Sequence, residues 1–144
     1  MFTIRQANSS DTAAVARLCG QLGYPAEEDS VNERFRAIDE DPHHAVFVAE
    51  DEDGSVVGWI HVMPRQTLLS SMVGELGGLV VDERGRRKGV GAALVAYAEE
   101  WALQSGYKEL VVRSDTRRSE SHSFYPALGF EVSKDQRVYR KSLS

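Results

Sequence analysis

Positive charge and glycine are concentrated in one short segment, Arg84-Gly85-Arg86-Arg87-Lys88-Gly89-Val90-Gly91. The residues before it read as a strand, and helix signals begin at Val90, so the segment should open a helix. A helix N-terminus has unpaired N–H groups and a partial positive charge. Gly89 and Gly91 would let an anion approach the backbone, and basic side chains would surround it. This arrangement predicts a site for phosphate or pyrophosphate.

Two common phosphate motifs do not fit this segment. No Gly-Lys-Ser/Thr is present, which excludes a P-loop. Gly89-Val90-Gly91 fits half of the dinucleotide fingerprint, but Leu94 stands where its third glycine belongs. The alternative is a solvated basic loop that only caps the helix, and it is disfavoured because basic residues at that end oppose the helix dipole.

Composition limits the class of protein. With 144 residues, 42% of them hydrophobic and 27% charged, the chain predicts one globular domain, residues 1–144. The net charge of −5 argues against a nucleic-acid binder. No apolar run suits a membrane span or a secretory signal, so we expect a cytoplasmic protein without membrane contact. Cys19 is the only cysteine and is expected to be a buried structural thiol, and no metal site is expected.

The elements that must position the basic segment follow from hydrophobic periodicity. The predicted order is β-α-α-β-β-β-α-β-α-β-β, which favours an α/β (α+β) fold with a central mixed sheet flanked by helices. Ala45–Glu50 and Ser55–Val62 should form a hairpin, in which Gly58 marks a bulge or a close packing contact. The strands Met72–Val81 and Leu110–Val112 should be parallel neighbours joined by a right-handed crossover. Phe130–Val132 and Arg137–Lys141 read as closing strands.

Two motifs then indicate a family. The run from Arg86 to Gly91 matches Arg/Gln-x-x-Gly-x-Gly/Ala, with Leu79-Val80-Val81-Asp82 as its lead-in. Downstream, Phe124-Tyr125-Pro126-Ala127-Leu128-Gly129-Phe130 matches Phe-Tyr-x-x-x-Gly-Phe. In these motifs, and in element order over essentially the whole chain, the sequence resembles the Gcn5-related N-acetyltransferases, the GNAT superfamily. The resemblance implies a GNAT-like fold.

The resemblance also implies a function and a coenzyme site. The function would be acetyl transfer from acetyl-CoA to a primary amine, by direct attack in a ternary complex. Backbone amides in the segment would hold the coenzyme pyrophosphate, and the pantetheine arm would follow the preceding strand, which splays from its neighbour. The residues implied are Leu79, Val80, Val81, Arg86, Arg87, Lys88, Gly89, Val90 and Gly91. Where relatives often have an asparagine this chain has Arg118, followed by Ser119, and Arg118 could instead reach a coenzyme phosphate.

Catalytic roles fall first to Tyr125 and Glu75. A phenol stays protonated at neutral pH, so Tyr125 could give a proton to the leaving thiolate, or it could only pack against the coenzyme. Glu75 interrupts an apolar, glycine-rich strand and could be the base or bind the amine, or it could form a salt bridge. Asp115 and His122 are rival bases, and His61 could line the acceptor side.

The sequence alone leaves the amine acceptor and the oligomeric state undetermined. An acidic protein suits a small cationic amine, such as an aminoglycoside or polyamine, and a protein amine is also compatible. A non-catalytic acyl-CoA sensor with the same fold is the alternative function, and a regulator that binds nucleic acid is a third. The family resemblance allows a homodimer, since relatives are often dimers.

Overall fold

The computed structural model spans residues 1–144 and describes all of them except Arg87. The chain divides into two compact units, Met1–Val112 and Arg113–Ser144. The two units are treated separately below.

The first unit is built on a five-stranded sheet in the order β1-β2-β3-β4-β5. The strands are β1 Phe2–Gln6, β2 Ala45–Asp51, β3 Val56–Arg65, β4 Val73–Val81 and β5 Leu110–Val112. Neighbours from β1 to β4 are antiparallel, whereas β5 runs parallel to β4. The predicted hairpin and the predicted parallel pair are both confirmed.

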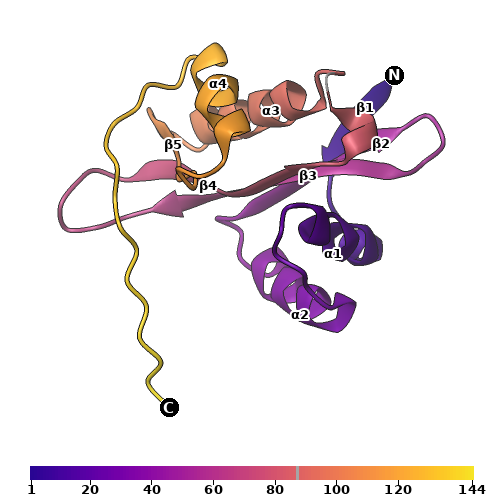
Figure 1. Cartoon of the computed structure of the whole chain (residues 1–144), viewed down its shortest axis with the longest axis horizontal. Coiled ribbons are helices and arrows are strands. Elements are labelled where there is room, and N and C mark those ends of the chain that lie inside the picture. Colours follow the sequence, from indigo (N-terminus) through magenta and orange to yellow (C-terminus); the bar gives the residue numbers. More distant parts are fainter. Residues whose placement is uncertain (87) are drawn as a thin grey trace. The chain divides into compact units, whose positions relative to one another are not determined.

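Helices cover both faces of this sheet (Figure 1). The helices α1 (Thr12–Gln21) and α2 (Glu28–Asp39) pack on one face, and α3 (Val90–Gln104) packs on the other. Short 3-10 turns, η1 (Ser9–Asp11) and η2 (Glu83–Gly85), precede α1 and follow β4. Among the residues described, no helix combines the length and hydrophobicity needed to cross a membrane.

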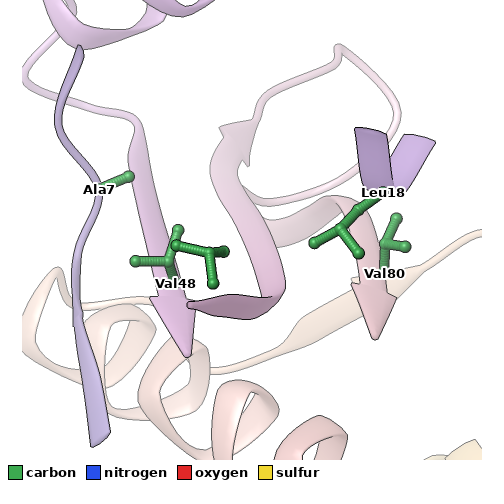
Figure 2. Close-up of a cluster of buried hydrophobic side chains, with 5 residues drawn as sticks. Ala7, Leu18, Val48 and Val80 are labelled. Carbon is green, nitrogen blue, oxygen red and sulfur yellow. The ribbon is translucent and has the colours of Figure 1, made fainter. Parts of the chain in front are cut away.

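The core has one layer on each side of the sheet. Under α1, Leu18 packs with Val48, Val80 and Ala7 (Figure 2). On the α3 side, Gly58 lies so close to the helix that a Cβ there would meet Leu94 and Val90 at 3.1 Å. Gly58 therefore marks a close packing contact, one of the two roles that its position in the strand predicted.

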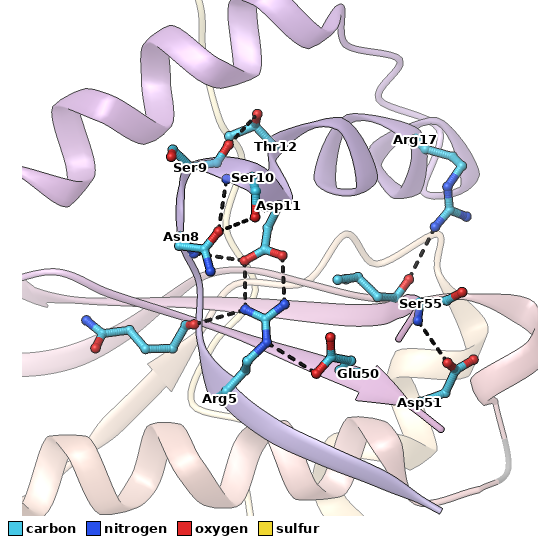
Figure 3. A network of polar contacts seen from close by, with 12 residues as sticks. Arg5, Asn8, Ser9, Ser10, Asp11, Thr12, Arg17, Glu50, Asp51 and Ser55 are labelled. Atoms are coloured by element: carbon cyan, nitrogen blue, oxygen red, sulfur yellow. Dashed lines mark hydrogen bonds and ion pairs between the residues drawn. The ribbon is translucent and has the colours of Figure 1, made fainter. Parts of the chain in front are cut away.

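A buried ion pair ties β1 to the start of α1 (Figure 3). Both terminal nitrogens of Arg5 donate to the Asp11 carboxylate at 2.9 Å, and the amide of Asn8 donates to it at 2.8 Å. Burial alone would raise the pKa of Asp11, but these hydrogen bonds outweigh it and lower the pKa. The charged carboxylate thus fixes where the chain turns from strand into helix.

The second unit contains α4 (Ser119–Ala127), followed by residues 128–144 without helix or strand. The predicted closing strands Phe130–Val132 and Arg137–Lys141 are therefore wrong. Their alternating apolar pattern suits a strand, but a strand forms only against a neighbour that accepts its hydrogen bonds, and this unit offers none among its described residues. Val132, Val138, Tyr139 and Leu143 are 83–91% exposed as a result.

Candidate active site

The strand β4 is longer than its parallel partner β5, which leaves an open edge in the sheet. Their register joins only Gly74, Glu75 and Leu76 of β4 to residues 110–112 of β5. From Gly77 to Val81, the described chain gives β4 a strand partner only on its β3 side. The peptide groups on the other side can hydrogen-bond an extended ligand. The predicted splaying of these two strands stays a prediction, because all three residues of β5 pair with β4.

From the end of this open edge, the chain leads through η2 to the N-terminus of α3. Gly89 is the N-cap residue and has a φ of +81°, a left-handed conformation that favours glycine. The hydrogen-bond ladder of α3 begins where the amide of Ala93 donates to the carbonyl of Gly89 at 3.0 Å. The helical amides before Ala93 therefore come before the first hydrogen bond of the helix. An anion site uses such amides as donors.

The basic side chains of this loop are not equivalent. Arg84 lies 3.2 Å from the Asp82 carboxylate, so its charge is partly neutralised. Arg86 and Lys88 are exposed, and the Nε of Arg86 donates to the carbonyl of Val81 at 3.4 Å. Arg87 lies outside the described residues. Within the described part, Arg86 and Lys88 are the members of the predicted cluster that can face an anion.

Asp82 anchors the loop at the end of β4. It is 3% exposed, and it accepts hydrogen bonds from Arg17 at 3.0 Å and from the amide of Arg84 at 3.0 Å. Burial alone would raise the pKa of Asp82, but the bonds from Arg84 and Arg17 outweigh it and hold that pKa well below its usual range. Sequence reasoning missed this anchor, because it took Arg84 as part of the phosphate cluster.

Glu75 lies where β4 and β5 still pair, directly before the opening. It is 8% exposed, and Oε1 lies 3.4 Å from NH1 of Arg65 on β3. The salt bridge, which was the alternative to a catalytic role for Glu75, is therefore present, and the carboxylate is buried next to the open edge. Glu75 thus combines a structural contact with a position beside the open edge of β4.

The sheet face next to Glu75 also holds a histidine pair. A Cβ on Gly77 would meet Nδ1 of His61 at 2.5 Å, so Gly77 and, by strand alternation, Glu75 share the face of His61. A Cβ on Gly78 would meet the Trp59 ring at 2.7 Å, and Trp59 packs on the α1 core, which places this face under α1 and α2. Nε2 of His61 lies 2.9 Å from Nδ1 of His44.

The second unit holds the remaining predicted residues. The ring of Tyr125 on α4 packs edge-on against Phe124 and Phe130, with centroids 5.0 and 5.5 Å apart. Burial of this half-buried ring raises the pKa of Tyr125, which keeps the phenol protonated. Arg118 is the N-cap residue of α4, and Ser119 is its first residue.

The two rival bases lie in the same unit. Asp115 accepts hydrogen bonds from the amide and the guanidinium of Arg117, which hold the pKa of Asp115 well below its usual range. A carboxylate with so low a pKa is a weak base. His122 is exposed on α4.

These features are compared here with known proteins. Residues 12–130 match the family described as Acetyltransferase (GNAT) family. The chain belongs to the GNAT acetyltransferase family. As a GNAT protein it is an N-acetyltransferase with acetyl-CoA as co-substrate, and the predicted family and fold class are confirmed.

Several relatives of this GNAT protein act on, or are solved with, defined ligands. It is 35% identical to the Aminoglycoside N(6')-acetyltransferase type 1 of Stenotrophomonas maltophilia, over 98% of this chain and 94% of the relative. The enzyme of the same name from Serratia marcescens is 38% identical, over 76% of this chain and 77% of the relative. A solved structure of AAC(6')-Iy with the bisubstrate analogue CoA-S-monomethyl-acetylneamine has a TM-score of 0.87 at 27% identity and covers 99% of both chains.

The residues of this GNAT protein suit coenzyme A. The open edge of β4 offers peptide groups to an extended arm, and the amides of α3 with Arg86 and Lys88 suit a pyrophosphate. The site therefore has an anion-binding end at α3, and its narrow end, where β4 and β5 pair, lies at Glu75.

Proposed function

We propose that this GNAT enzyme acetylates a primary amine of an aminoglycoside. The observation that supports it most is the open edge of β4, which runs from the phosphate-binding end at α3 to the buried carboxylate of Glu75. A negative charge at the narrow end suits a cationic acceptor. Aminoglycoside N(6')-acetyltransferases are among its similar relatives. We also propose that residues 1–144 act as one acetyltransferase domain, because the family match spans both units.

The direction of the groove determines where the acetyl group would lie. The pyrophosphate would lie against the amides of the loop residues 86–91, and the pantetheine arm would bond the backbone of Leu79, Val80 and Val81. The thioester would then reach the narrow end, where β4 and β5 meet at Leu76. Arg118 and Ser119 of the second unit are proposed as further coenzyme contacts.

The chemistry would be direct attack of a neutral amine on the thioester in a ternary complex. The nitrogen forms a bond to the carbonyl carbon and loses a proton to Glu75, and the carbon–sulfur bond breaks. The thiolate takes the phenolic proton of Tyr125, and the phenolate then regains a proton from water. The raised pKa of Tyr125 keeps that proton available at neutral pH. Glu75 would bind the acceptor amine and accept, directly or through water, the proton that the nitrogen loses as it bonds to the carbonyl carbon.

A screen of amine acceptors with acetyl-CoA, read by release of free thiol, tests this function. We expect turnover with neamine. Glu75→Gln and Tyr125→Phe should each lower kcat by about 10²-fold while coenzyme affinity stays within about twofold, because removal of a general acid or base affects chemistry and leaves coenzyme binding. Glu99→Gln, an exposed change on α3, is the control.

The same screen separates the enzyme from a sensor. Coenzyme binding without thiol release from any amine would favour the acyl-CoA sensor. Unchanged kcat in both variants with a good acceptor would show that the catalytic roles are wrong.

The exposed C-terminal segment supports a homodimer. Val132, Val138, Tyr139 and Leu143 are exposed apolar side chains, and β5 is an edge strand in the described sheet. A second copy could supply the strand partner that residues 130–141 lack. Light scattering should give a mass near twice the 16.0 kDa of one chain, and Val138→Asp should shift it toward 16.0 kDa. A monomeric mass for the unaltered chain would exclude this dimer.

A further inference from the structure

The mechanism above leaves a half-buried histidine pair without a role. His61 of β3 and His44, the residue before β2, share a hydrogen bond of 2.9 Å, and their ring planes are inclined by only 24°. We propose that His61, His44 and Asp41 form a proton relay that removes the ammonium proton of the acceptor at Gly77 of β4. This inference rests on the proposed function, since it concerns the amine of that reaction.

The partners determine which ring nitrogens hold hydrogen. Nε2 of His44 faces the Asp41 carboxylate at 3.5 Å, and an ionised carboxylate only accepts, so Nε2 holds the hydrogen. In neutral His44 the other nitrogen, Nδ1, is then an acceptor, and Nε2 of His61 must be the donor. Neutral His61 is left with an unprotonated Nδ1, which is a proton acceptor.

That Nδ1 lies beside Gly77, the first residue of the open edge of β4. A Cβ on Gly77 would come within 2.5 Å of it, so this nitrogen faces the backbone of Gly77 with no side chain of that residue between them. The β3–β4 register shifts between His61 and Val62, which marks a bulge at Gly77, the first residue of the open edge. Glu75, on the same face, lies two residues earlier in β4.

Burial explains why His61 alone cannot hold the proton taken from the amine and why the relay needs His44. Burial, with a smaller effect of nearby His44, lowers the pKa of His61 to about 4, so the ring is neutral at pH 7 and is a poor place for a positive charge. His44 is more open, with 24% of its side chain exposed, and lies beside the Asp41 carboxylate. The charge is therefore better placed on His44 than on His61.

The step conserves every proton. The N–H bond of the ammonium group breaks and Nδ1–H of His61 forms, while the Nε2 proton of His61 passes to Nδ1 of His44. His61 ends neutral, and His44 ends as an imidazolium paired with Asp41. The amine keeps the electron pair that then attacks the thioester carbon, and His44 later gives its proton to water.

The surroundings of the relay favour its release of protons. Asp41 is held by two hydrogen bonds, from the amide of His43 to Oδ1 at 2.9 Å and from the amide of His44 to its carbonyl at 3.1 Å. His44 and Asp41 line a pocket of about 140 Å³ together with Asp39 and Gln6, which can hold water. Other charged groups on this sheet face are Glu75 and Arg65, which pair with each other, and Arg5, which pairs with Asp11 and Glu50.

Kinetics at several pH values test the relay, with neamine and acetyl-CoA as substrates. His61→Gln should lower kcat/KM by about 10²-fold at pH 7, and His44→Gln by about tenfold, because glutamine can keep a hydrogen bond but cannot transfer the proton. Both losses should shrink toward pH 9, where the free amine is supplied by solution. A loss from distorted packing would be the same at every pH.

His43→Asn is the matched control, because the side chain of His43 is next to His44 in the sequence but lies outside the relay. The relay is overturned if His61→Gln or His44→Gln behaves like His43→Asn, or if the losses do not change with pH. If His61→Gln does not fold, the half-exposed His44→Gln decides the outcome alone. Absence of turnover by the unaltered enzyme with every amine would instead overturn the proposed function.

Discussion

Single side chains determine where the loop after β4 starts, and Asp82 is central among them. It ends β4, caps η2, and accepts from both Arg17 and Arg84 while only 3% exposed. Two cations that lie far apart in the sequence thus meet at one carboxylate. The loop geometry depends on this charge more than on the exposed basic side chains.

Replacement of Asp82 by alanine should therefore destabilise the protein. We expect a loss of about 2–4 kcal/mol in the free energy of unfolding, because one cap and two charge-assisted hydrogen bonds disappear. Urea denaturation measures this loss in the free energy of unfolding. Glu83→Gln changes the exposed neighbour and should shift stability by less than about 0.5 kcal/mol. Equal effects of the two changes would contradict the role of Asp82.

The Asp82 carboxylate should also make the free energy of unfolding depend on pH in the acidic range. Because the pKa of Asp82 is lower in the folded than in the unfolded chain, where it is near 3.8, the folded state binds the proton less well. Its contribution is full above about pH 5 and falls as pH drops through 4 and below. Urea midpoints between pH 3 and 6 should fall less steeply for Asp82→Asn than for the unaltered protein, and parallel slopes would contradict this.

At this scale the sequence predicted types of residue better than their partners. Gly89 and Gly91 could be found because a phosphate site needs glycine at set places in a helix start. The pairing of Arg84 with Asp82 could not be found, nor could the contact of His44 with His61, because each joins groups whose distance depends on the folded chain.

At the scale of elements, the N-terminus of α3 combines a backbone requirement with a ligand requirement. Gly89→Ala should cost about 1 kcal/mol of stability, because a Cβ disfavours its φ of +81°. It should also raise the KM for acetyl-CoA, since the strained residue would shift the amides that face the pyrophosphate. Thermal denaturation and steady-state kinetics measure the two effects.

The chain offers a matched control for this change. Gly54, in the turn between β2 and β3, has the same φ of +81°, and its Cβ direction is equally open. Gly54→Ala should reduce stability by a similar amount and leave the KM for acetyl-CoA unchanged. A KM effect of equal size in both variants would show that backbone strain alone is responsible.

Elements with local signals were predicted well, and elements that need a distant partner were not. The amphipathic pattern of α3 and the turn of the β2–β3 hairpin are local, and both were confirmed. The closing strands had the right alternation, but the second unit provides no described strand for them to pair with. Alternation shows which side chains share a face and leaves the partner strand undetermined.

For the molecule as a whole, coenzyme binding should complete the sheet. The open edge of β4 lacks a strand partner from Gly77 to Val81 in the described chain, and a bound pantetheine arm would bond there. Hydrogen exchange at residues 77–81 should slow with coenzyme A, while that of Val48 and Ile60, inside the β2–β3 ladder, should change little. At about 100 times its dissociation constant, the coenzyme should stabilise the fold by about 2.7 kcal/mol. Unchanged exchange at residues 77–81 would contradict this binding mode.

The packing of Trp59 on Gly78 gives the enzyme a built-in optical reporter. Its Nε1 is a buried atom without a hydrogen-bond partner in the described chain, so the indole lies in an apolar setting. The sequence has only one other tryptophan, Trp101 of α3, which packs against Tyr107. A Trp101→Phe variant would therefore emit from the indole at the bulge alone. Changes in the intensity and wavelength of its fluorescence would follow ligand arrival beside β4 in real time, without a label or a turnover assay.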